Sequence, residues 1–260
     1  MAPSAPPSAP PSSIAPPPMA PWRELRGLRD VAELPFRWSE LVSSVPAGDG
    51  SFVWVLPGFR TDDSATWALR RFLARLGYQV AGWGLGRNRG DVDGVLPRLT
   101  ERAAALGQRH GSLAIVGWSL GGYLGREVAR EVPKAVRQVV TLGSPVVGGP
   151  KYTIAARHWR RRGIDLDELE AQVARRAQER PLQVPVTAVY GRRDAIVAWR
   201  ACIDSIDRVT EHVEVDTTHV GLGFSADVYR VVADRLARPA ASPPSDPSGG
   251  VARNRRVGLL

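Results

Sequence analysis

Residues 113–131 read LAIVGWSLGGYLGREVARE, and this stretch decides the expected fold. Its apolar start predicts a buried strand, and the segment that follows Ser119 has the spacing of a helix. Between them, residues 117–121 match the pattern G-x-S-x-G, with small residues where the chain turns sharply. This context predicts an exposed serine on a strand-to-helix turn. The alternative is a small-residue turn that serves packing alone.

Apolar runs alternate with helical segments on both sides of this stretch. Strands are expected at 52–56, 78–83, 113–117, 136–142, 184–190 and 213–215, and helices at 66–76, 92–110, 120–132 and 224–237. Residues 22–45 predict one or two short helices interrupted at Pro35. Because continuous apolar strands between helices are typical of a parallel sheet covered on both faces, we expect an α/β fold with a mostly parallel sheet.

Three segments depart from this alternation. Residues 146–182 are expected to form a small helical cap, with helices over 154–162 and 166–180. Residues 1–21 and 239–260 are rich in Pro and Ser, and we expect them to be disordered because they carry too little apolar surface to fold. The expected folded domain is therefore 22–238.

Composition excludes several classes of protein. Of the 260 residues, 35 are Lys or Arg and 26 are Asp or Glu, which gives a net charge of +9. Only Lys134 and Lys151 are lysine, and such arginine bias is typical of GC-rich coding sequence, so we expect no specific nucleic-acid partner and only weak attraction to anionic surfaces. With no apolar run long enough for a transmembrane segment and no signal-peptide pattern, a cytoplasmic protein is expected. One cysteine and scattered histidines predict no metal and no other cofactor.

A serine nucleophile needs a base to remove its proton. His219 follows the last expected strand, which places it at the same sheet edge as Ser119, and we predict that it is the base. His158 falls in the cap, His212 within or just before a strand, and His110 at a helix end on the opposite edge.

The base needs an acid to orient its ring. Asp194 follows a strand at the correct edge and is the predicted acid. Asp216, three residues before His219, is the competitor, but so short a connection places it poorly to reach the ring.

Two backbone amides are needed to hold the oxygen of a tetrahedral intermediate. We predict those of Leu120, after the serine, and Phe59, in the loop after the first strand. An ordinary Pro-Gly turn is the alternative there. Trp83 and Trp118 are candidates for lining an acyl pocket, with core packing as the alternative.

Several of these pieces resemble the α/β-hydrolases, specifically their bacterial lipase- and esterase-like branch. The matching pieces are VLPGF (55–59), GWGLGRNRG (82–90), GWSLGG (117–122), VRQVVTLGSPVVGG (136–149), YGRRDAIV (190–197) and THVGLG (218–223). The resemblance implies the same triad and the same two amide donors. Pro57 departs from it, because many relatives carry histidine before the glycine.

The expected function is hydrolysis of a carboxylic ester through an acyl-enzyme, on a small-molecule or lipid-like substrate. A thioesterase or acyltransferase would use the same triad and is the alternative. A third hypothesis is a non-catalytic protein that binds an anionic surface.

Overall fold

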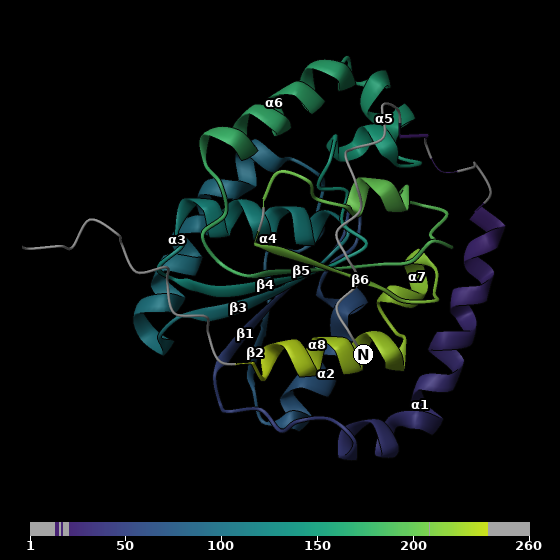
Figure 1. The fold of residues 1–260 in the computed structure, drawn as a ribbon, viewed down its shortest axis with the longest axis vertical. Coiled ribbons are helices and arrows are strands. Elements are labelled where there is room, and N and C mark those ends of the chain that lie inside the picture. Colours follow the sequence, from purple (N-terminus) through teal and green to yellow (C-terminus); the bar gives the residue numbers. More distant parts are fainter. Residues whose placement is uncertain (1–13, 16, 18–20, 208, 239–260) are drawn as a thin grey trace, which may run out of the picture.

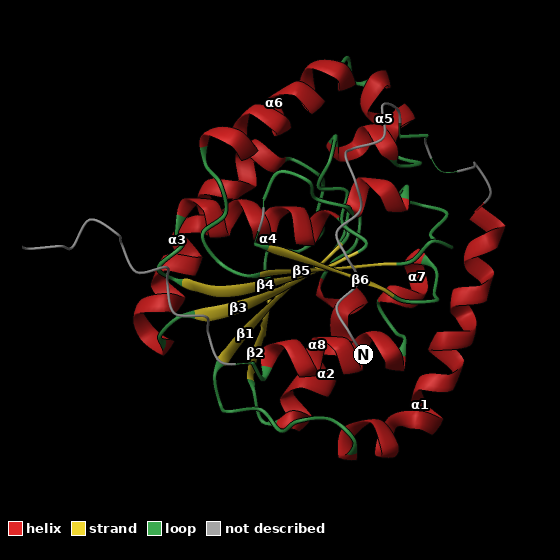
Figure 2. Cartoon of the chain, in the orientation of Figure 1, coloured by secondary structure: helices red, strands yellow, loops and turns green. Residues whose placement is uncertain are grey.

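A six-stranded sheet, in which all five strand pairs are parallel, forms the centre of the molecule (Figure 2). The computed structural model describes residues 14, 15, 17, 21–207 and 209–238. The strands are β1 (Phe52–Leu56), β2 (Gln79–Gly82), β3 (Leu113–Trp118), β4 (Val136–Leu142), β5 (Val186–Tyr190) and β6 (Thr210–Glu214). Their order is β2-β1-β3-β4-β5-β6. The expected α/β fold with a parallel sheet is confirmed.

Helices cover both faces of this sheet (Figure 1). One face carries α1 (Gly27–Ser43), α2 (Trp67–Leu76), α7 (His219–Leu222) and α8 (Ala226–Leu236), and the other carries α3 (Val92–His110) and α4 (Leu120–Glu131). Side chains alternate along a strand, so Val53 and Val55 of β1 pack in one core cluster while Trp54 and Leu56 pack in the other. Burial on both faces explains why β1 is apolar throughout.

The chain between β4 and β5 makes the expected helical excursion. It contains η3 (Gly149–Tyr152), α5 (Ala156–Arg161) and α6 (Leu166–Glu179). Three further short helices are η1 (Pro21–Arg26), η2 (Asp63–Thr66) and η4 (Trp199–Cys202). Among the described residues, no helix combines the length and apolar character needed to cross a membrane.

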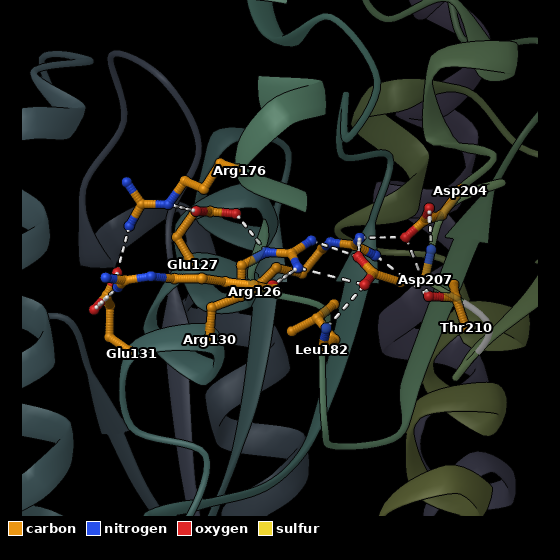
Figure 3. A network of polar contacts seen from close by, with 10 residues as sticks. Arg126, Glu127, Arg130, Glu131, Arg176, Leu182, Asp204, Asp207 and Thr210 are labelled. Atoms are coloured by element: carbon orange, nitrogen blue, oxygen red, sulfur yellow. Dashed lines mark hydrogen bonds and ion pairs between the residues drawn. The ribbon is translucent and has the colours of Figure 1, made fainter. Parts of the chain in front are cut away.

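A largely buried ion-pair network connects α4 to its neighbours (Figure 3). Arg126 pairs with Asp204 and Asp207, and Arg130 also pairs with Asp207. On the other side, Arg176 of α6 lies 2.6 Å from Glu131. The network therefore fixes both the excursion and the segment before β6 to the helix that follows Ser119.

The structure differs from the sequence prediction at Pro35, and it describes few residues of the two expected tails. The break at Pro35 is wrong, because α1 continues through it. Pro35 lies on the exposed side of α1, where the carbonyl that loses its backbone donor is open to water. The disorder expected for 1–21 and 239–260 falls on residues that lie outside those described, apart from residues 14, 15, 17 and 21.

Candidate active site

Ser119 adopts a backbone conformation that non-glycine residues rarely take. Its φ is +55° and its ψ is −122°, between the end of β3 and the start of α4. The flanking glycines are required by space: a Cβ on Gly117 would overlap the backbone of Gly121 and Gly122, and one on Gly121 would overlap the carbonyl of Leu56. Such strain in a tight turn is typical of functional sites.

The order of the strands places a crevice beside this turn. The chain order reverses between β1 and β3, and in open parallel sheets ligands bind at the carboxyl ends of strands at such a reversal. The loop after β1 lies against Ser119, because a Cβ built on Gly58 would be 3.3 Å from the Cβ of Ser119. Ser119 and the loop that carries Phe59 therefore share this edge.

Asp194 and His219 form a buried hydrogen-bonded pair. Nδ1 of His219 lies 2.6 Å from Oδ2 of Asp194, and the two side chains are only 6% and 1% exposed. The other oxygen of Asp194, Oδ1, accepts hydrogen bonds from the amides of Ile196 and Val197 at 2.8 and 2.7 Å. The carboxylate is thus held by its own loop and directed at the imidazole.

Four contributions act on the pKa of His219. Burial alone would lower it, but the charge and the hydrogen bond of Asp194 raise it, and the charge of Glu24 raises it further. The net effect is a pKa above the ordinary value for histidine. This environment stabilises the protonated ring, which is the form that a general base reaches during the reaction.

The competing acid and histidines lie elsewhere. Asp216 pairs with Arg193 at 3.0 Å. His212, on β6, accepts the amide hydrogen of Asp204 at its Nε2 atom, and His110 stacks on Phe52 at the amino end of the sheet. The ring of His158, from α5, packs against Phe59 with centroids 5.6 Å apart. The structure therefore brings His219 alone of the four histidines to Asp194.

Two backbone amides beside Ser119 are available to a ligand. Leu120 begins α4, so its N–H has no acceptor within the helix. Among the described residues, the amide of Phe59 has no acceptor either, whereas the next two amides, of Arg60 and Thr61, donate to the carbonyls of Asn88 and Gly58. Unused donors of this kind can bind an oxyanion.

Comparison with known proteins bears on the fold. Neither a protein-family model nor a curated protein matches the sequence. Among solved structures, it is similar to the metagenome-derived lipolytic enzymes LipS and LipT, with a TM-score of 0.56 and 16% identity over 74% of this chain and 93% of the other. It is also similar to a monoacylglycerol lipase of Paleococcus ferrophilus, with a TM-score of 0.52, 14% identity, and 74% and 96% of the two chains covered. The mouse alpha/beta hydrolase domain-containing protein 10 gives a TM-score of 0.50 at 16% identity, covering 71% of this chain and 88% of that one.

The chain has the α/β-hydrolase fold. At identities this low, the similarity supports the fold and says nothing about the substrate. The substrate has to be inferred from the residues of the site.

Within this α/β-hydrolase fold, the two candidate pocket tryptophans occupy different environments. Trp83 is 2% exposed, packs in the core beneath α3 and donates its indole hydrogen to the carbonyl of Gly86 at 2.7 Å, which supports the packing alternative. Trp118 lies beside the site. Its ring centroid is 6.0 Å from that of His219, and its indole donates to the carbonyl of His219 at 3.2 Å.

Glu24, which had no signal in the sequence, connects the segments that carry Asp194 and His219. This residue of η1 is 7% exposed. Its carboxylate accepts hydrogen bonds of 2.8 Å from the amides of Ala195 and Val220. These amides directly follow Asp194 and His219 in the chain, so one side chain holds both the loop of Asp194 and the start of α7.

Asn88 was also missed, and it braces the loop after β1. Its side chain is 1% exposed, donates to the carbonyl of Pro57 at 3.0 Å and accepts from the amide of Gly90. Its backbone bonds both Arg60 and Thr61. The only local signal was a polar residue among glycines, which also suits an ordinary turn.

Proposed function

We propose that this protein is a serine-dependent hydrolase of carboxylic esters, with Ser119 as nucleophile, His219 as base and Asp194 as the acid that orients the base. The observation that carries the proposal is the buried 2.6 Å contact between Asp194 and His219 at the sheet edge where Ser119 holds a strained turn. A buried histidine with a raised pKa, held by a carboxylate at the same sheet edge as a strained serine, is the expected arrangement for acyl transfer.

The reaction would proceed in two stages. Oγ of Ser119 attacks the ester carbonyl while Nε2 of His219 takes its proton. The amides of Phe59 and Leu120 bind the oxyanion, and the intermediate releases the alcohol, which takes the proton from His219. Water then attacks the acyl-serine by the same route, giving the free acid and restoring Ser119.

Aromatic groups near the site favour an apolar acyl chain. Phe59 packs against Trp159 of α5 with ring centroids 5.6 Å apart, and Trp118 packs edge-on against Phe224 at 6.1 Å. We therefore infer a lipid-like or medium-chain acyl group.

The decisive experiment compares serine variants on p-nitrophenyl esters graded by acyl length. Ser119→Ala is expected to lower kcat/KM by about 10⁴-fold or more. The matched control is Ser112→Ala, an exposed serine just before β3, at the opposite end of the same strand. A serine-directed phosphonate should label the wild type and the Ser112→Ala control at Ser119, and it should not label Ser119→Ala.

Wild-type turnover by Ser119→Ala, or labelling of another serine, would refute the assignment. Thioester substrates and added alcohols in the same panel separate hydrolysis of esters from the thioesterase and acyltransferase alternatives. Because all three share the acyl-enzyme, the labelling result applies to each.

A further inference from the structure

The outward face of η1 and α1 is apolar along most of its length. Trp22 is 67% exposed, Leu25 63%, Leu28 53% and Phe36 89%. The complete set of exposed apolar residues on this face, here called the apolar stripe, is Trp22, Leu25, Leu28, Val31, Ala32, Pro35 and Phe36. Spacings of three and four residues keep them on one side of the helices.

Further along α1, Leu34 and Leu41 pack in the core as they would on an ordinary surface helix, but the amino-terminal part of the segment departs from that pattern. Here two acidic residues point inward. Glu24 binds the amides after Asp194 and His219, and Asp30 accepts the hydroxyl hydrogen of Thr217 at 2.6 Å. The apolar side faces solvent, at an energetic cost that a docking surface would recover on binding.

Arginines flank the stripe. Arg23 and Arg26 of η1 and three arginines near η4 line a cavity of about 400 Å³, together with Asp194, whose carboxylate is held by His219 and by its own loop. We call this set the arginine rim: Arg23, Arg26, Arg192, Arg193 and Arg200. Arg192 and Arg193 pair with Glu214 and Asp216. Within the part of the chain that the structure describes, the other three have no carboxylate partner.

We propose that the apolar stripe and the arginine rim form a docking surface for an anionic phospholipid membrane. The rim argues for this occupant over another protein, because the guanidinium groups of Arg23, Arg26 and Arg200, which have no carboxylate partner among the described residues, suit phosphate headgroups. A tryptophan beside leucines and arginines, as on the adjoining η1 and α1, is the arrangement of helices that lie in the membrane interface. The proposal is independent of the chemistry at Ser119.

The arrangement also predicts how binding depends on lipid and salt. Trp22, Leu25 and Leu28 enter the boundary between headgroups and acyl chains, while Arg23 and Arg26 remain at the headgroup level. Binding should therefore require both apolar insertion and negative headgroups, and it should weaken as salt screens the arginines.

The experiment measures sedimentation of the full chain with vesicles of phosphatidylglycerol or of phosphatidylcholine. We expect binding to the first and at least tenfold weaker binding to the second. The triple variant Trp22→Ser/Leu25→Ser/Leu28→Ser should lose at least tenfold in binding. Arg23→Gln/Arg26→Gln should lose about fivefold per arginine, because each contributes by its charge near an anionic surface.

Matched controls lie on other elements. Trp67→Ser removes an exposed tryptophan from α2, and Arg161→Gln/Arg175→Gln removes two exposed arginines from α5 and α6. Both should bind as the wild type does. If the triple variant does not fold, Phe36→Ser alone replaces it, because this side chain is almost wholly exposed.

Three results would overturn the proposal. They are an absence of binding to phosphatidylglycerol, equal binding to both lipids, and stripe and rim variants that bind no worse than their controls. Light scattering tests whether a second copy of the chain occupies this face instead. A wild-type dimer that becomes monomeric in the triple variant would assign the apolar stripe to that second copy.

Discussion

Glu24 Oε2 accepts a 2.8 Å hydrogen bond from the amide of Val220, a residue 196 positions further along the chain. Its other oxygen bonds the amide of Ala195 at the same distance. The loop of Asp194 and the start of α7, where His219 lies, are thus held by a residue that precedes the first strand. The geometry of the pair depends on a segment that contributes nothing to the sheet.

Replacing Glu24 should therefore change the pH dependence of activity. The base must be neutral to act, so kcat/KM rises as pH passes through the pKa of His219. Because the charge of Glu24 raises that pKa, Glu24→Gln should move the acid limb of the profile to lower pH. It should also lower kcat, since one amide loses its acceptor.

Glu33→Gln is the matched control, because Glu33 lies on α1 and pairs with Arg29 at the surface. Its pH profile should match that of the wild type. A Glu24→Gln profile that kept the wild-type midpoint would show that Glu24 acts on stability alone.

The choice between the two candidate acids gives a second prediction. Asp194→Asn should lower kcat/KM by about 10⁴-fold, because the ring of His219 loses the partner that fixes its tautomer. Asp216→Asn should change it less than about threefold, since Asp216 pairs with Arg193 at the surface. Steady-state kinetics of both variants on one ester tests this choice. A large loss of kcat/KM in Asp216→Asn with little loss in Asp194→Asn would identify Asp216 as the acid.

Asn88 should affect turnover more than substrate binding. Asn88→Ala removes the hydrogen bond to Pro57 and loosens the loop that presents the amide of Phe59. We expect kcat to fall by about 10- to 100-fold, the scale of a small displacement in a catalytic group, with KM nearly unchanged. Gln79→Ala is the control, because Gln79 likewise donates its side-chain amide to a backbone carbonyl, that of Gly50. An equal effect of both variants on kcat would contradict this role.

The network on α4 should make stability depend on pH. Burial alone would raise the pKa of Asp204, but Arg126 and the amides of Asp207 and Ile206 lower it overall. A carboxyl with a lowered folded-state pKa stabilises the fold above its unfolded pKa of about 3.9 and loses this effect as the pH falls through the folded value. Asp204→Asn should therefore cost about 3–5 kcal/mol at pH 7 in urea unfolding, and the difference should shrink below about pH 4.

Asp167→Asn controls for the loss of a carboxylate, since Asp167 is 84% exposed and pairs with Lys151 at the surface. It should change the free energy of unfolding by less than about 1 kcal/mol. A difference for Asp204→Asn that stayed constant with pH would mean that its charge does not stabilise the fold.

Apolar periodicity predicted the buried elements well. The expected bounds of β1, α3 and β4 are those observed, because these segments bury a continuous face or stripe. The edge strand β6 was expected at 213–215 but spans Thr210–Glu214. It is partly exposed and includes polar residues, so its sequence lacks the apolar run on which the prediction depended.

The sequence likewise predicted some residues of the candidate site and not others. Strand-end positions indicated that Asp194 and His219 would meet, and the two lie in hydrogen-bonding distance, although their catalytic role stays a prediction. The sequence placed His219 in a loop, whereas it begins the four-residue α7, too short to show a helical pattern. Glu24 had no local signal, because its partners are 171 and 196 residues away.

The parallel sheet also has practical value for engineering. Since every strand runs the same way, the residues assigned to chemistry gather at one edge, and the turns that enter the strands lie at the other. Gly111 and Gly50 occupy such entering turns, where there is open space but where φ values of +77° and +79° require that the glycine itself be kept. A fluorophore, an affinity peptide or an immobilising linker attached at the neighbouring exposed Ser112 would therefore leave the opposite edge open to substrate.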